Sequence, residues 1–163
     1  MNKTYHLALM GVLTALLFMG QVIMAVLPNI EIISLLIILY TIFFGRKVFW
    51  MIYCFVFLEG FLYGFGMWFF NYLYIWAALA LVCLPLRNNR SALFWSIISG
   101  FFGLAFGTLC TLPYLITGGP SAAFSYWVSG LGFDLTHCIG NVVHCLVLFK
   151  PLYSLLEKVV SHA

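Results

Sequence analysis

Long apolar runs, separated by short polar or glycine-containing connections, follow one another along the whole sequence. An α-helix needs about 20 predominantly apolar residues to cross a bilayer, and runs of this length predict helices rather than strands. The sequence therefore predicts an all-α membrane protein, a compact bundle of six transmembrane helices that forms a single domain over residues 1–163. The expected spans are residues 7–27, 30–44, 48–62, 67–86, 92–116 and 127–149.

The spans 30–44 and 48–62 are shorter than usual, and taken alone they could be re-entrant segments. The positions of the basic residues favour full crossings, because cytoplasmic loops collect Lys and Arg. Basic residues occur at four places, and two apolar runs separate each place from the next. Both termini are therefore predicted to be cytoplasmic, with all seven basic residues inside: Lys3, Arg46, Lys47, Arg87, Arg90, Lys150 and Lys158.

Composition restricts the class of protein further. The chain is 65% hydrophobic and only 7% charged, whereas soluble domains have about 45–50% apolar and about 25% charged residues. A soluble protein and a disordered one are both excluded. The basic residues form no stripe on one face, so nucleic acid is not expected as a partner. The five cysteines lie in apolar runs without CxxC spacing, which favours buried side chains over a disulfide framework.

Three of the four acidic residues lie within or at the ends of apolar runs. With the topology above, Glu31, Glu59 and Asp134 all fall in the outer half of the bundle, and no basic residue lies at their depth. A charge in hydrocarbon costs about 3 kcal/mol or more, so such side chains usually face a cavity or a partner. The alternative for each is a neutral, hydrogen-bonded carboxyl packed between helices. Three acids at one depth favour a cavity that opens outward.

The sixth span carries a polar stripe. Asp134, His137, Asn141 and His144 fall within an arc of about 80° on a helix. The stripe is interpreted as the lining of a binding site, and the alternative is a set of hydrogen bonds that hold the bundle together.

The fourth span is densely aromatic. Trp68, Tyr72 and Trp76 are spaced i, i+4, i+8 and should share a face. An aromatic belt at the membrane interface would account for the first two. Trp76 lies too deep for a belt, so a stacking wall for a planar ligand is the interpretation that covers all three.

Small residues and missing motifs complete the pattern. Ala8, Gly11 and Ala15 form a small-residue face on the first span, and Gly100, Gly103 and Gly107 form another on the fifth. Such rows let helices approach closely. The row on the fifth span is expected to serve packing inside the bundle, whereas the row on the first span could serve such packing or docking to another membrane protein. The chain contains no P-loop, Gly-rich nucleotide motif, HExxH or GxSxG. It is therefore not expected to be an enzyme or to hold a cofactor or metal, and uphill transport would need energy from a partner.

These features together resemble the S components of energy-coupling factor transporters, the vitamin-capturing membrane subunits of prokaryotic importers. Local sequence carries the resemblance as well: LALMGVLTAL at residues 7–16 resembles the family's first helix, with Gly11-xxx-Ala15 where Ala-xxx-Ala is usual. LPNIE at residues 27–31 resembles the segment that joins helices one and two. FDLTHCIGN at residues 133–141, followed by KPL at 150–152, resembles the last helix.

The resemblance implies a subunit of the prokaryotic cytoplasmic membrane that captures a small water-soluble nutrient, a vitamin or related ring compound, from outside. It implies association with a transmembrane coupling subunit and two cytoplasmic ATPases, with the face of Ala8, Gly11 and Ala15 as the docking surface. The start Met1-Asn2-Lys3 lacks the Met-His of the nickel and cobalt branch. The predicted substrate-binding residues are Asn29, Glu31, Glu59, Trp68, Tyr72, Trp76, Asp134, His137 and Asn141.

Two other classes fit parts of the pattern. A structural membrane subunit of the cell-shape machinery can share this size and helix count, and it would need no pocket. A membrane metalloenzyme could use Asp134, His137 and His144. Residues 134 and 144 are separated by about 15 Å along a helix, which disfavours one shared metal site.

Overall fold

The computed structural model describes residues 3–161, and this part of the chain is helical with no strand. The chain forms α1 (Lys3–Met24), α2 (Ile33–Phe44), the 3-10 turn η1 (Gly45–Lys47), α3 (Val48–Tyr63), α4 (Met67–Leu86), α5 (Ala92–Cys110) and α6 (Leu112–Ser161). The all-α prediction is confirmed. The predicted starts at residues 48, 67 and 92 coincide with the starts of α3, α4 and α5.

Within residues 3–161, five helical segments are long and apolar enough to cross a membrane: α1, the stretch 33–63, α4, α5 and α6. The stretch 33–63 contains α2, η1 and α3, for which the hydrophobic pattern predicts two crossings. Alone, α2 has 12 residues and is about 18 Å long, less than the roughly 30 Å hydrocarbon core. The fold is thus that of a helical protein with several segments that are long and apolar enough to span a membrane.

The segment after α5 differs from the sequence prediction. A helix to residue 116 and a loop over 117–126 are expected, but α5 ends at Cys110, and the loop residues are helical apart from Gly119. Gly119 has φ +75° and ψ −174° and turns the chain by itself. Pro120 then begins the next helical stretch, where a proline is well tolerated because a first-turn N–H has no partner in the helix. The predicted loop over residues 117–126 is therefore too long, because only Gly119 departs from helical geometry there.

Helix α6 also continues past the expected end at residue 149. Pro151 lies inside it, and the helix ends at Ser161. The segment expected as a separate amphipathic tail is its last part, where Leu156 is buried.

The central helix is α2. Its side chains are apolar on nearly all sides, and none is exposed, as expected for a helix that is surrounded by others. In contrast, α1, α3, α4, α5 and α6 all expose large apolar side chains, such as Leu7, Phe61, Phe70, Phe101 and Ile139. Soluble proteins rarely expose so much contiguous apolar surface, so this outer face suits lipid.

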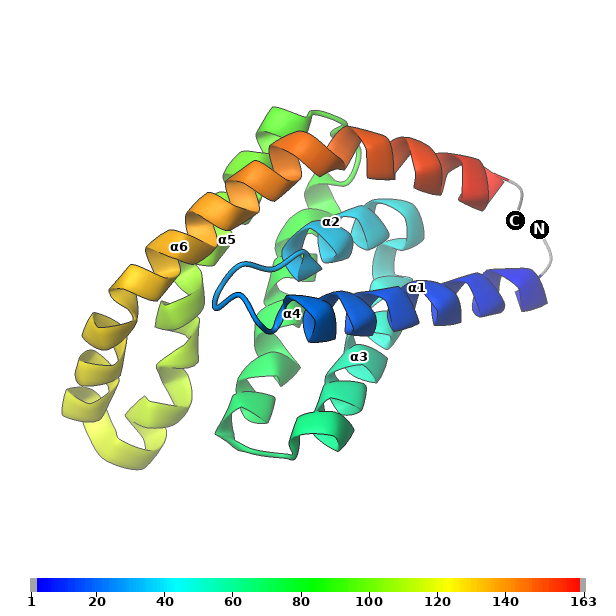
Figure 1. Cartoon of the computed structure of the whole chain (residues 1–163). Coiled ribbons are helices and arrows are strands. Elements are labelled where there is room, and N and C mark those ends of the chain that lie inside the picture. The colour runs from blue at the N-terminus through cyan, green and yellow to red at the C-terminus, as the bar shows by residue number, and fades with distance from the viewer. Residues whose placement is uncertain (1–2, 162–163) are drawn as a thin grey trace.

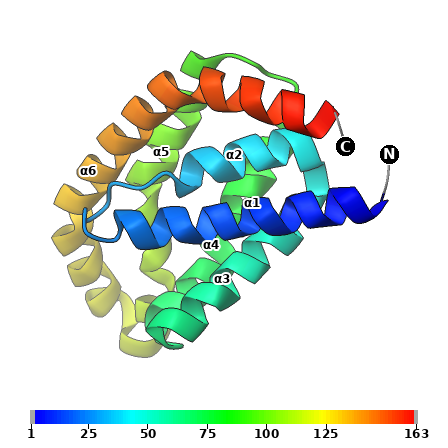
Figure 2. The same cartoon turned by 45° about the vertical axis from the view of Figure 1, so that its right-hand side comes forward.

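Helices α5 and α6 lie side by side in both views (Figures 1 and 2). The close approach of α5 and α6 depends on the glycines of α5, as predicted from Gly100, Gly103 and Gly107. A Cβ built on Gly103 would lie 2.8 Å from the backbone nitrogen of Cys138, and one on Gly107 would overlap the Asp134 carboxylate. The row of small residues on α5 therefore serves internal packing.

The basic residues gather at one end of the bundle. The first turn of α1 and the last turn of α6 lie at this end (Figures 1 and 2). Lys3 and Lys47 line the same surface hollow, and the Arg87 guanidinium packs against η1. The Arg90 guanidinium lies 3.9 Å from the Glu157 carboxylate. The connections from α1 to α2 and from α3 to α4 lie away from this end (Figures 1 and 2).

Candidate functional site

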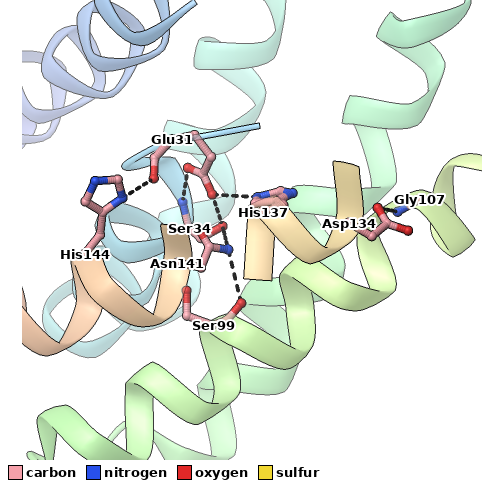
Figure 3. Close-up of polar contacts among 8 residues, drawn as sticks. All are labelled: Glu31, Ser34, Ser99, Gly107, Asp134, His137, Asn141 and His144. Atoms are coloured by element: carbon pink, nitrogen blue, oxygen red, sulfur yellow. Dashed lines mark hydrogen bonds and ion pairs between the residues drawn. The ribbon is translucent and has the colours of Figure 1, made fainter. Parts of the chain in front are cut away.

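The connection between α1 and α2 is held by a buried carboxylate. Glu31 is 8% exposed, and its carboxylate accepts hydrogen bonds from the Ser34 amide at 2.8 Å and from the Ser34 hydroxyl. The Ser34 amide belongs to the first turn of α2, where backbone N–H groups have no partner within the helix. The Nε2 atom of His137 lies 3.0 Å from Oε1 of Glu31. This carboxylate therefore joins the start of α2 to α6 (Figure 3).

Two further residues of the polar stripe strengthen this junction. Nδ1 of His144 lies 3.0 Å from the backbone carbonyl of Glu31. The Asn141 amide donates to the Ser34 hydroxyl at 3.2 Å and to the Ser99 carbonyl at 3.1 Å (Figure 3). Asn141 and His144 thus match the alternative interpretation of the stripe, in which interhelical hydrogen bonds hold the bundle together. We call Glu31, Ser34, His137, Asn141 and His144 the latch.

Asp134 is the first residue of the stripe and contacts α5. Its Oδ1 accepts a 2.9 Å hydrogen bond from the Gly107 amide. Its Oδ2 is buried and has no hydrogen-bond partner among the described residues. The close contact with Gly107 fixes this carboxyl against the α5 backbone and leaves one acceptor unused.

Three cavities share lining residues at the end of the bundle opposite the basic residues. Cavity A, about 240 Å³, lies under the α1–α2 connection, and its lining includes Gln21, Asn29, Glu31, Tyr72, Trp76, Phe106 and His137. Cavity B, also about 240 Å³, is lined by Gln21, Ala25, Glu59, Tyr63, Trp68 and Tyr72. Cavity C, about 300 Å³, includes Asn29, Phe106, Tyr126 and Asp134 in its lining. Gln21 and Tyr72 belong to both A and B, while Asn29 and Phe106 belong to both A and C.

The aromatic face of α4 contributes to both cavities A and B. Trp68, Tyr72 and Trp76 share one side of the helix, as their spacing predicts. Ring centroids lie 5.2 Å apart for Trp68 and Tyr72 and 5.4 Å apart for Tyr72 and Trp76. The interplanar angles are 81° and 79°, because aromatic pairs prefer edge-to-face contact. Successive rings on this face are therefore nearly perpendicular to one another, and the stacking wall for a planar ligand stays a prediction.

Eight of the nine predicted substrate-binding residues line at least one of the three cavities. Asn141 is the exception, and it lies within the latch. Gln21 and Phe106 are cavity residues that the sequence analysis does not identify. Gln21 is one of two polar side chains in residues 7–27, the other being Thr14, and that rarity was a usable signal. Phe106 carries no such signal, since phenylalanines are frequent throughout the chain.

The small residues of α1 lie away from these cavities. Ala8, Gly11 and Ala15 are all exposed. Gly11 and Ala15 line a wide apolar groove of about 760 Å³ between α1 and α3, together with Trp50 and Phe57. A Cβ built on Gly11 would meet nothing within 4 Å, so this glycine serves no packing inside the chain.

Between residues 3 and 161, no group of three His, Cys, Asp or Glu side chains is arranged to hold a metal ion. Asp134 contacts the Gly107 amide, whereas His144 contacts the Glu31 carbonyl. The metalloenzyme hypothesis therefore finds no ligand cluster in this part of the chain.

No protein-family model matches the chain, and no curated protein or solved structure is significantly similar to it.

Proposed function

We propose that this chain is the substrate-binding membrane subunit of an importer of the energy-coupling factor type. It captures a small water-soluble nutrient, a vitamin or related ring compound, from outside the cell. The observation that carries the proposal is the cluster of cavities A, B and C at one end of the bundle. These cavities bring together three of the four acidic residues and the aromatic face of α4. Concave sites lined by aromatic rings and a few polar groups are typical of small-molecule binding.

In the proposed topology the chain crosses the prokaryotic cytoplasmic membrane six times, with both termini and all basic residues inside. The gathering of Lys3, Lys47, Arg87 and Arg90 at one end supports this orientation, because cytoplasmic loops are rich in Lys and Arg. Cavities A, B and C then open toward the outside, where a nutrient is encountered.

Within the site, the α1–α2 connection acts as the cover of cavity A. Asn29 has a positive φ of 58° and lines both A and C, so a change in its backbone would alter both cavities. The latch holds this cover closed through Glu31 and His137. Trp76 and Trp68 offer ring faces to the substrate in cavities A and B, respectively.

Partner chains supply the energy in this proposal, since the chain has no nucleotide-binding motif. A coupling subunit would dock on the groove that contains Gly11 and Ala15, where small residues allow another helix to approach closely. Two cytoplasmic ATPases complete the assembly.

The test is native mass spectrometry of the purified chain in mild detergent, followed by identification of the released small molecule. We expect one bound ligand per chain, with its affinity reduced by Trp68→Ala and by Asp134→Ala. Ile139→Ala is the matched control, because Ile139 is exposed on the lipid side of α6. Unchanged affinity in both site variants would disprove the site. A chain that carries no ligand but co-purifies with cell-shape proteins would favour the structural subunit instead.

A further inference from the structure

Glu59 carries a buried carboxyl oxygen for which residues 3–161 provide no hydrogen-bond partner. It is 2% exposed, and its Oε1 has no hydrogen-bond partner among the described residues. The other two acids of the site each have at least one hydrogen-bond donor, although Oδ2 of Asp134 is also unpartnered. The carboxylate of Glu31 has three donors from Ser34 and His137, and that of Asp134 has the Gly107 amide. Buried polar atoms are almost always hydrogen-bonded, so an exception calls for a specific explanation.

Cavity B supplies that explanation, because Glu59 is part of its lining. Gln21 lies in the same lining, and its Oε1 is a second buried acceptor without a partner. None of the linings of cavities A, B and C contains a Lys or Arg residue. Two residues with unpartnered buried acceptors thus line one cavity, and its lining brings no Lys or Arg to either of them.

The remaining walls of cavity B suit a ring that carries positive charge. Trp68, Tyr72 and Tyr63 line it, and indole and phenol faces attract cations within about 6 Å. Cavities of about 150 Å³ hold one benzene molecule. The 240 Å³ of cavity B therefore fits a single ring with a short substituent.

We propose that Glu59 selects the charge of the ligand, and that the ligand is a ring compound with a cationic nitrogen which donates a hydrogen bond to this carboxylate. This inference rests on the proposed function, since it names the substrate class of the same site. Glu31 then takes no direct part in binding, because its oxygens are occupied by the latch.

Three probes of equal shape test the charge directly: benzylamine, benzyl alcohol and benzoate. Binding to the purified chain is followed by quenching of tryptophan fluorescence, since Trp68 and Trp76 line cavities B and A. We expect benzylamine to bind at least about tenfold more tightly than benzyl alcohol, the factor that one hydrogen bond to a charged group supplies. Benzoate should bind more weakly than either.

Glu59→Gln should abolish the preference for benzylamine, while Glu157→Gln, at an exposed position near the end of α6, should retain it. Near-ultraviolet circular dichroism verifies that both variants are folded. Equal binding of the three probes to the wild-type chain, no binding of any of them, or an undiminished preference in Glu59→Gln would overturn the inference. The wild-type comparison decides the matter even if Glu59→Gln does not fold.

The inference and the proposed function fail in different ways. If the chain delivers a neutral or anionic nutrient inward, the proposed function stands and the role of Glu59 in charge selection is wrong. If the chain prefers benzylamine through Glu59 but never carries or transports a nutrient, the cation site stands and the transport function is wrong.

Discussion

Replacing Glu31 with alanine removes the acceptor at the centre of the latch. Three buried donors, the Ser34 amide, the Ser34 hydroxyl and the His137 ring, then lose their partner. Each orphaned buried donor costs about 1–3 kcal/mol. Loss of the buried carboxylate also removes its desolvation penalty, which offsets part of this cost. We therefore expect Glu31→Ala to lower the free energy of unfolding by about 3 kcal/mol.

Thermal unfolding in mild detergent, followed by tryptophan fluorescence, measures this effect. In a chain of this size 1 kcal/mol corresponds to about 2–4 °C, so Tm should fall by about 6–12 °C. Glu157→Ala is the matched control, because the Glu157 side chain is 54% exposed and lies 3.9 Å from Arg90. Exposed pairs of this kind contribute about 1 kcal/mol at most.

A double-mutant cycle with His137→Ala makes the test specific. If the two side chains act together, the double variant should be less destabilised than the sum of the single variants. The account of the latch is refuted if Glu31→Ala lowers Tm no more than Glu157→Ala does, or if the effects of Glu31→Ala and His137→Ala are additive.

Three further predictions concern the packing of α5 on α6, the docking surface on α1 and the connection between α1 and α2. Gly103→Ala should destabilise the chain by about 1–3 kcal/mol, because the new Cβ would meet the Cys138 backbone. Gly132→Ala, with open space around it, should not, and equal Tm values would contradict the packing account. Gly11→Leu should abolish co-purification of the coupling subunit but leave ligand affinity unchanged, and retained co-purification would move the docking surface elsewhere. Asn29→Val should lower Tm because a β-branched residue resists its positive φ, whereas Asn29→Gly should not, and equal Tm values would show that this backbone geometry is unimportant.

The sequence predicted the outline of the fold because hydrophobic runs and basic connections are local signals. The starts of α3, α4 and α5 follow from them directly. The loop around Gly119 was predicted to be too long. Its composition suggests a long loop, but a Gly-Pro pair can end one helix and begin the next within two residues. Continuation of α6 through Pro151 was missed because a proline usually ends a helical pattern.

Most residues that line the three cavities could be predicted from the sequence, but the contacts that each of them makes could not. Buried acids and an aromatic face at one depth identify Glu31, Glu59 and Trp76 as candidates from sequence. The partners of Glu31 are Ser34 and His137, which lie on different helices, so sequence spacing does not show that they meet. The perpendicular rings of α4 likewise result from side-chain packing, which helical spacing does not determine.

Uptake into proteoliposomes tests the central claim most directly. The small molecule released from the purified chain is radiolabelled and offered to vesicles that contain this chain alone, or this chain with a coupling subunit and two ATPases. The account predicts binding without uptake in the first case and ATP-dependent uptake in the second. Uptake by the chain alone, or none with the full assembly and ATP, would contradict it.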